Sequence, residues 1–239
     1  MTLDVRIVKA DRLDCRIVTH EWDFDLRRGG EIDAYWRERT QANPSLYDGP
    51  VLLGASVEQA VGGEGRSVLS IGFFETRFSR FLAWRNFGFP GPGVYNCFAM
   101  PAVRSADGAF LLGEMNPRHS SAGNIYFPAG TPDPIDVRDG RVDLEGSLRR
   151  ELEEETGICA EEGLMEPGWT IVFESRRVAC MKLIQSPHSA AVLLSRVETF
   201  LAREKEPELS GAHMISRRDQ LADPRLPGFM KGFLASMLT

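Results

Sequence analysis

Residues 150–158 read Arg-Glu-Leu-Glu-Glu-Glu-Thr-Gly-Ile, and this stretch decides which fold the sequence predicts. It closes a segment, residues 143–156, whose leucines recur every fourth position and therefore predict a helix. At about 100° per residue, these leucines fall within about 80° of one another and form one apolar stripe. The stripe consists of Leu144, Leu148 and Leu152. We therefore expect one face of this helix to be buried.

Three glutamates overlap the buried face of the same helix. Relative to Leu148, Glu155 falls about 20° away, inside the apolar stripe, while Glu151 lies about 60° and Glu154 about 120° away. A carboxylate at the edge of an apolar face is unfavourable unless it is paired, hydrogen-bonded or bound to a metal. Because carboxylate oxygens are the ligands that Mg²⁺ prefers, this spacing indicates a site for a hard cation.

A solvated, charged helix is the alternative interpretation. Ion pairs four residues apart, such as Arg150 with Glu154, are common on exposed helix faces. That interpretation accounts for Glu145 and Glu153 but not for Glu155.

The stretch resembles the second half of the signature of Nudix hydrolases. Every specified position of that half is matched, namely by Arg150, Glu151, Leu152, Glu154, Glu155, Gly157 and Ile158. Residues 128–130, Pro-Ala-Gly, resemble the Pro-Gly-Gly turn that opens the same motif. The first half departs from the pattern, because the segment after this turn is longer than usual and Val142 stands where the family has an upstream glutamate.

The resemblance implies a role for each of these side chains. Glu154 and Glu155 would be the main ligands of Mg²⁺, with Mn²⁺ as the alternative metal. Glu151 would be a further ligand or would orient the attacking water, and Arg150 would hold the carboxylates through an ion pair. A backbone carbonyl of Ala129 or Gly130 would complete the metal's ligands.

Two further positions are predicted outside the helix. Members of the family often add a later glutamate, for which Glu208 is our choice, with Glu206 and Glu204 as rivals and a solvated acidic turn as the alternative. Arg118, in the loop before the Pro-Ala-Gly turn, is a candidate phosphate clamp, because guanidinium groups bind phosphate in a bidentate manner. A solvent-exposed arginine without a role is an equally good interpretation of Arg118.

The N-terminal part carries a second, narrower resemblance. Residues 35–49 and 74–84 resemble the N-terminal region of eukaryotic Nudix enzymes that hydrolyse UDP-glucose. The glycine- and proline-rich segment 88–93 predicts a linker or tight loop. We therefore predict an N-terminal subdomain at residues 1–92 and a Nudix hydrolase domain at residues 93–239. The expected fold class is α/β, a Nudix α/β/α sandwich with a mixed sheet, preceded by the smaller subdomain.

The remaining pattern predicts further elements. Strands are expected at residues 5–18, 51–57, 68–74, 94–103, 110–113, 125–127, 170–174, 178–184 and 190–197. Helices are expected at residues 31–41, 78–84 and 228–238, and a long loop at residues 131–141.

Composition narrows the class of partner and the compartment. The net charge of -6 and the pI near 5.4 disfavour binding along a nucleic-acid backbone, which requires a basic surface. No apolar stretch of the sequence is long enough to predict a membrane span, and no signal peptide is expected. The four cysteines form no Cys-x-x-Cys pair and the four histidines share no ligand spacing, so we expect free thiols, no zinc site and a cytoplasmic location. The residues are Cys15, Cys97, Cys159 and Cys180, and His20, His119, His188 and His213.

The function predicted from these features is magnesium-dependent hydrolysis of a nucleoside diphosphate linked to another moiety, with a UDP-sugar favoured. The alternatives are a pyrophosphatase acting on coenzyme A, a dinucleotide or a nucleoside triphosphate, and a non-catalytic nucleotide sensor on the same fold. The expected partner is a small-molecule nucleotide, and homodimer formation is left open.

Overall fold

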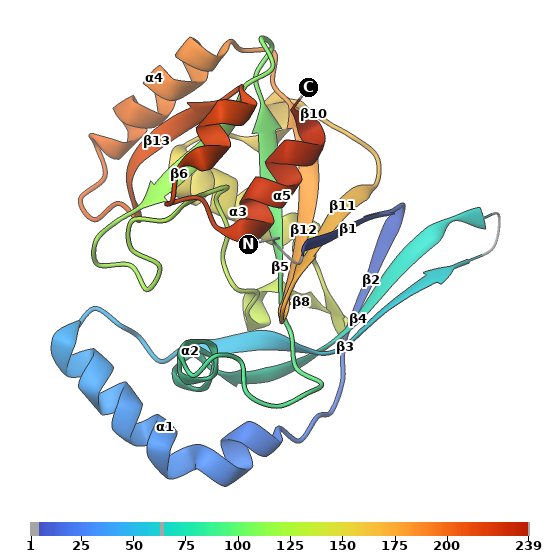
Figure 1. Cartoon of the computed structure of the whole chain (residues 1–239), viewed down its shortest axis with the longest axis vertical. Coiled ribbons are helices and arrows are strands. Elements are labelled where there is room, and N and C mark those ends of the chain that lie inside the picture. The colour runs from blue at the N-terminus through green and yellow to red at the C-terminus, as the bar shows by residue number, and fades with distance from the viewer. Residues whose placement is uncertain (1–4, 63–64, 239) are drawn as a thin grey trace. The chain divides into compact units, whose positions relative to one another are not determined.

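The computed structural model describes residues 5–62 and 65–238 and divides into two compact units (Figure 1). The first unit comprises Met1–Asp11, Phe98–Gly130 and Glu145–Thr239. The second comprises Arg12–Cys97 and Thr131–Leu144. Because the units alternate along the chain, the N-terminal strand belongs with the C-terminal elements. As a functional division, the boundary between residues 92 and 93 stays a prediction.

The first unit is built on the larger of two sheets. Its strand order is β1-β11-β12-β5-β6-β13, with β10 paired to β12 and β7 paired to β6. The strands are β1 (Val5–Ala10), β5 (Asn96–Arg104), β6 (Phe110–Met115), β7 (Ile125–Tyr126), β10 (Leu164–Met165), β11 (Trp169–Glu174), β12 (Arg177–Gln185) and β13 (Leu209–Ile215). The central strands β5 and β6 are buried almost throughout, as expected of strands that are covered on both faces.

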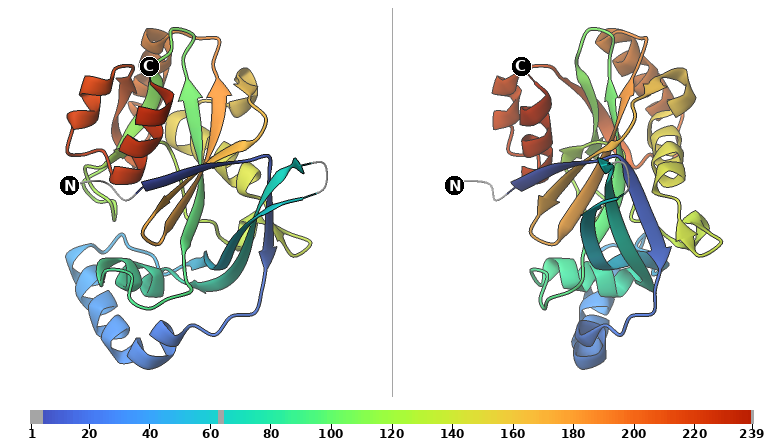
Figure 2. Two further views of the ribbon diagram at one scale, coloured as in Figure 1. Left: turned by 45° about the vertical axis from the view of Figure 1, so that its right-hand side comes forward. Right: turned by 90° about the vertical axis from the view of Figure 1, so that its right-hand side faces the viewer.

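Helices cover both faces of this sheet. Figure 2 shows α5 (Gly228–Met237) on one face, with α3 (Leu144–Thr156) and α4 (Ala190–Leu201) on the other. Two short 3-10 helices, η3 (Ala160–Glu162) and η4 (Arg218–Ala222), connect these elements to the sheet. The predicted α/β/α sandwich is confirmed.

Three aromatic rings fill the layer between the sheet and α5. Phe110 of β6, Phe127 and Phe233 of α5 are fully buried, with ring centroids between 5.6 and 6.0 Å apart. Such tilted and edge-to-face pairs add to the free energy gained by burying the rings. Phe127 directly precedes the Pro-Ala-Gly turn, so this cluster anchors the start of that turn.

The strand predicted at residues 190–197 is wrong, because the segment forms helix α4. A short apolar run such as Ala-Ala-Val-Leu-Leu is compatible with either a strand or a buried helix. The side chain of Ser189 caps the helix by accepting a hydrogen bond from the backbone N–H of Val192. Leu193 and Val197, four residues apart, are the buried side chains of α4, and this is helical spacing.

The second unit is a smaller sheet with two helices. Its strand order is β3-β4-β2-β9-β8, and β2 runs parallel to β4. The strands are β2 (Arg12–Ile17), β3 (Pro50–Val61), β4 (Ser67–Arg77), β8 (Val137–Arg138) and β9 (Arg141–Val142), and the helices are α1 (Asp23–Ala42) and α2 (Phe78–Asn86). Aromatic side chains dominate its core, where Trp22 contacts both Phe24 and Trp84.

Two sequence expectations in this unit need correction. The predicted strand at residues 5–18 is two strands, β1 and β2, which belong to different sheets. The predicted long loop at residues 131–141 is structured and contains the 3-10 helix η2 (Pro134–Asp136) and the strands β8 and β9. β9 pairs with β2, and the carbonyl of Pro132 accepts a hydrogen bond from the backbone N–H of Leu52. The insertion is therefore part of the second unit, and its hydrogen-bond partners lie far away in sequence.

None of the four cysteines, all of which lie among the described residues, forms a disulfide. Cys15, Cys97 and Cys180 are buried, and Cys159 is partly exposed. Over residues 5–62 and 65–238, no helix combines the length and the apolar character needed to cross a membrane.

The end of α3 yields a prediction about stability. Gly157 has φ +68°, and a Cβ there would meet the ring of Phe200, so Gly157→Ala should destabilise the protein by about 1–3 kcal/mol. Gly30 lies inside α1 with open space around it, so the matched Gly30→Ala should stabilise by about 0.5–1 kcal/mol. Denaturant unfolding of both variants measures the difference. Equal stability of Gly157→Ala and the wild type would contradict this account.

Candidate active site

Helix α3 carries most of the candidate residues, and its burial follows the predicted faces. Leu148 and Leu152 are fully buried, and Glu155 is only 4% exposed beside them. The side chain of Glu151 is 14% exposed and that of Glu154 is 62% exposed. The carboxylates therefore run from the core to the solvent along one side of the helix.

Glu155 is the most constrained of these side chains. Its Oε1 accepts a hydrogen bond of 3.0 Å from the backbone N–H of Ala129. Its Oε2 is buried and has no hydrogen-bond partner among the described residues. Burial, followed by the charges of Glu151 and Glu208, raises the pKa of Glu155 well above its ordinary value of 4.5. A buried carboxylate with one unsatisfied oxygen is a group that a bound cation would stabilise.

Glu151 lies against the Pro-Ala-Gly turn. A Cβ on Gly130 would collide with the carboxylate of Glu151, so a larger residue at this position of the turn would force the Glu151 side chain to shift. Burial raises the pKa of Glu151 to about 7, the ion pair with Arg150 opposes the rise, and the charges of Glu154 and Glu208 add to it. A carboxylate with a pKa near neutrality is suited to accept a proton from water.

Arg150 contacts two of the carboxylates through one nitrogen. Its Nη1 lies 2.7 Å from Oε1 of Glu151 and 3.5 Å from Oε2 of Glu154. The ion pairs predicted for Arg150 are therefore present. The turn makes a contact that the sequence did not predict, because it presents the N–H of Ala129 to Glu155, whereas we expected a backbone carbonyl to face the metal.

The three candidates for the later glutamate, Glu204, Glu206 and Glu208, differ in their surroundings. Glu208 immediately precedes β13, and its charge acts on both Glu151 and Glu155. Glu208 as a whole residue is exposed, but its carboxylate is partly buried. This burial, and after it the charge of Glu154, raises the pKa of Glu208. Glu204 and Glu206 are exposed in the preceding segment. Of the three candidates, Glu208 is the one that the fold brings to the helix carboxylates.

Arg118 lies in the loop between β6 and β7. It is exposed, and its backbone N–H donates to Oδ1 of Asn116 over 2.9 Å. The N–H of Asn116 donates in turn to the carbonyl of Glu208 over 2.9 Å. The loop that carries Arg118 is therefore tied to the segment that carries Glu208, and the role of Arg118 as a phosphate clamp stays a prediction.

These residues fit a divalent cation by their chemistry. Among residues 5–62 and 65–238, no three His, Cys, Asp or Glu side chains are already arranged as a metal-binding group. The charges of neighbouring glutamates nevertheless raise the pKa values of Glu151, Glu155 and Glu208, and one buried oxygen of Glu155 lacks a partner among the described residues. Like charges held together at a partly buried position are unfavourable until a cation neutralises them.

Known proteins place this chain in a family. The family model described as NUDIX domain matches residues 96–237. The chain belongs to the Nudix family. It is a Nudix hydrolase, an enzyme of the pyrophosphatase class, and enzymes of this family act on small nucleotides and generally use divalent metal ions. No curated protein matches the chain.

Several solved structures are similar to this Nudix chain. A MutT protein from Methanosarcina mazei Go1 is 18% identical over 60% of this chain and 92% of its own, with a TM-score of 0.37. The protein DR0079 from Deinococcus radiodurans is 14% identical over 60% of this chain and 83% of its own, with a TM-score of 0.43. The Nudix hydrolase RenU from M. smegmatis is 16% identical over 59% of this chain and 81% of its own, with a TM-score of 0.37. The family assignment rests on the domain match.

The buried carboxylate predicts an unusual dependence of stability on pH. A carboxyl group whose pKa is raised in the folded state favours folding below its unfolded pKa, near 4.5, and this contribution is lost as the pH rises through the folded pKa. Glu155→Gln keeps the acceptor for Ala129 but cannot ionise. In chelator at about pH 8, we therefore expect Glu155→Gln to be more stable than the wild type by about 1–3 kcal/mol.

Thermal and denaturant unfolding across a range of pH test this expectation. The advantage of Glu155→Gln should shrink toward about pH 4.5, and added Mg²⁺ should stabilise the wild type more than the variant. A wild type that is the more stable protein in chelator at alkaline pH would show that Glu155 is not an unfavourable buried charge.

Proposed function

We propose that this Nudix hydrolase cleaves a nucleoside diphosphate linked to another moiety, in a magnesium-dependent reaction, with a UDP-sugar as the favoured substrate. The observation that carries the proposal is the group of Glu151, Glu154, Glu155 and Glu208, in which one buried oxygen of Glu155 lacks a partner. Arg150 pairs with Glu151 and Glu154, and a bound cation would neutralise the charge of Glu155 and Glu208 as well.

The proposed metal ligands are Glu154, Glu155 and Glu208, with Glu151 as a ligand or as the group that handles the water proton. When bound, Mg²⁺ or Mn²⁺ would neutralise diphosphate charge and make water more acidic. Arg150, through Nη1, holds Glu151 and Glu154 in place. Arg118 is the proposed phosphate contact from the loop between β6 and β7.

The bond changes follow from hydrolysis of a diphosphate. The oxygen of water forms a bond to one phosphorus, the bridging P–O bond breaks, and its electron pair stays with the departing phosphate. The proton released by water is accepted by Glu151, whose pKa of about 7 suits a general base at neutral pH. A UDP-sugar would yield UMP and a sugar 1-phosphate.

The preference for a UDP-sugar has its support in the second unit. The two stretches that resemble UDP-glucose-hydrolysing enzymes, residues 35–49 and 74–84, pack against one another in this unit. The rings of Trp36 and Phe78 lie edge to face at 6.2 Å, and the backbone N–H of Ser79 donates to Oδ1 of Asp48 over 2.7 Å. The two resembling stretches therefore contact one another in the second unit.

A non-catalytic nucleotide sensor is the alternative from another functional class. Binding alone does not require three carboxylates on α3 in addition to Glu208. Coenzyme A, dinucleotides and nucleoside triphosphates are alternative substrates for the same chemistry. The cytoplasmic location and the homodimer also stay proposals.

Substitution of the carboxylates tests whether the site is catalytic. Glu154→Gln and Glu155→Gln should each lower turnover by roughly 10²-fold or more, because each removes a proposed ligand of the cation whose charge would stabilise the transition state. Glu153→Gln, on the exposed face of the same helix, is the matched control and should retain wild-type turnover. Rates are measured with Mg²⁺, after chelation and after metal add-back. Full activity in chelator, or wild-type rates in both active-site variants, would contradict the proposal.

A substrate panel tests the favoured substrate. With Mg²⁺, UDP-glucose should give UMP and glucose 1-phosphate at a higher kcat/KM than coenzyme A, NADH or nucleoside triphosphates do, as measured by nucleotide chromatography. Faster cleavage of coenzyme A or of a triphosphate would reject the UDP-sugar while leaving the Nudix reaction in place.

A further inference from the structure

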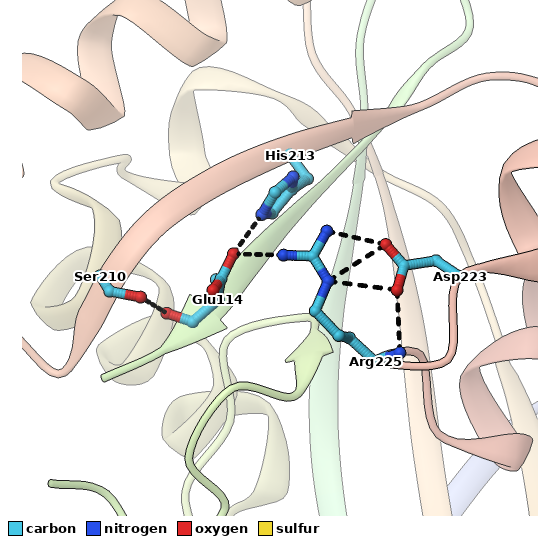
Figure 3. Close-up of polar contacts among 5 residues, drawn as sticks. All are labelled: Glu114, Ser210, His213, Asp223 and Arg225. Atoms are coloured by element: carbon cyan, nitrogen blue, oxygen red, sulfur yellow. Dashed lines mark hydrogen bonds and ion pairs between the residues drawn. The ribbon is translucent and has the colours of Figure 1, made fainter. Parts of the chain in front are cut away.

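A second polar cluster of the first unit lies on β6, β13 and the segment before α5. Its centre is Glu114, and we call Glu114, His213, Asp223 and Arg225 the Glu114 cluster (Figure 3). One oxygen of Glu114, Oε2, lies 2.8 Å from Nε2 of His213 and 2.9 Å from Nη1 of Arg225. A single carboxylate oxygen therefore joins β6 to β13 and to the segment that precedes α5.

Arg225 is held rigidly for this contact. Its Nε and Nη2 donate to the carboxylate of Asp223 at 2.8 to 3.2 Å, and its backbone N–H donates to the same side chain at 2.8 Å. The ion pair with Arg225 lowers the pKa of Asp223 to about 2. With Nε and Nη2 turned to Asp223, Nη1 is the nitrogen that reaches Glu114, as Figure 3 shows.

On the β13 side, the cluster holds the strand that begins directly after Glu208. The register between β6 and β13 shifts between Leu209 and Gly211, so Ser210 is an extra residue. The hydroxyl of Ser210 donates to the backbone carbonyl of Glu114 over 3.3 Å. Bulges redirect neighbouring side chains and often lie beside active sites. The bond from Glu114 to His213 secures β13 just beyond this irregular point.

On the β7 side, the cluster reaches the turn that contacts the catalytic helix. The carbonyl of Arg225 accepts a hydrogen bond of 3.0 Å from the backbone N–H of Ile125, and Ile125 is the partner of Glu114 in the β6–β7 pair. Ala129, four residues after Ile125, donates to Glu155. Glu114 is thus linked by short stretches of backbone both to Glu208 and to the turn that binds Glu155.

We propose that Glu114 is a positioning residue for the metal site, fixing β13 and β7 so that Glu208 and the Pro-Ala-Gly turn are held where a divalent cation needs them. The inference rests on the proposed function of the carboxylates. Outer groups that orient metal ligands commonly contribute about 10- to 100-fold to metal affinity or activity. Glu114 acts without touching the substrate or the metal.

Binding of Mn²⁺ to the substrate-free protein, measured by titration calorimetry, is the direct test. Glu114→Gln keeps the size of the side chain but removes the charge that holds His213 and Arg225 together. We expect its dissociation constant for Mn²⁺ to rise about 10-fold or more. The Mg²⁺ concentration for half-maximal turnover should rise in parallel, while kcat at saturating metal stays near the wild-type value.

The chain contains a matched control in the first unit. Glu162 also bonds to an arginine, Arg196, and lies 3.7 Å from the Nε2 of a histidine, His188. These partners lie on α4 and just before it, and no hydrogen bond or ion pair between described residues joins their side chains to β7 or β13. Glu162→Gln removes the same kind of interaction and should leave Mn²⁺ affinity unchanged. An equal loss in both variants would mean that general destabilisation, and not positioning, explains the effect.

The remaining outcomes separate this inference from the proposed function. A wild type that binds no Mn²⁺ would reject the metal site itself. A wild type that binds Mn²⁺ as tightly as a folded Glu114→Gln would reject only the positioning role. If Glu114→Gln does not fold, two variants of His213 replace it in the test. The amide of His213→Gln can still donate to Glu114, so this variant should keep most of the Mn²⁺ affinity. His213→Ala has no such donor and should lose affinity. Equal affinities of these two variants would also reject the role.

Discussion

Glu155 lies on the same helix face as Leu148 and Leu152, and this burial of a carboxylate is the constraint on which the site depends. Water is excluded from the group, so one oxygen takes the N–H of Ala129 and the other has no partner among the described residues. A folded protein keeps such an arrangement only when the surrounding packing enforces it. The leucines of α3 supply that packing, because their burial fixes which face of the helix points toward the sheet.

The Pro-Ala-Gly turn that binds Glu155 is held in place by contacts of its own. Phe127 is fully buried against Phe110 and Phe233 and is the last residue before the Pro-Ala-Gly turn. Gly130 then lets the backbone come close to Glu151 without a clash. The close approach of turn and helix is therefore produced by a core contact before the turn and a missing side chain within it.

The structure also shows why a carboxylate site of this kind reduces stability. Burial raises the pKa values of Glu151, Glu155 and Glu208, and the charges of neighbouring glutamates raise them further, so their charged forms are disfavoured in the folded protein without a cation. The same unfavourable charge makes the site attractive for a cation. Binding energy and folding energy are therefore coupled through a few side chains, as is common at functional sites.

Local periodicity was enough to predict α3, its buried leucines and the carboxylates on its edge, because a helix places residues on faces by spacing alone. The helix at residues 190–201 was missed, since a short apolar run has no period that separates a strand from a buried helix. The choice of Glu208 over Glu204 and Glu206, the N–H of Ala129 and the contacts of Glu114 depend on strand pairing between residues far apart in the sequence. The hydrogen bonds of residues 131–142 to β2 and β3 likewise join segments that are far apart in the sequence. The sequence by itself determined which carboxylates share a helix face, whereas the tertiary structure decided which distant groups meet them, because sheet register is set by packing across the whole core.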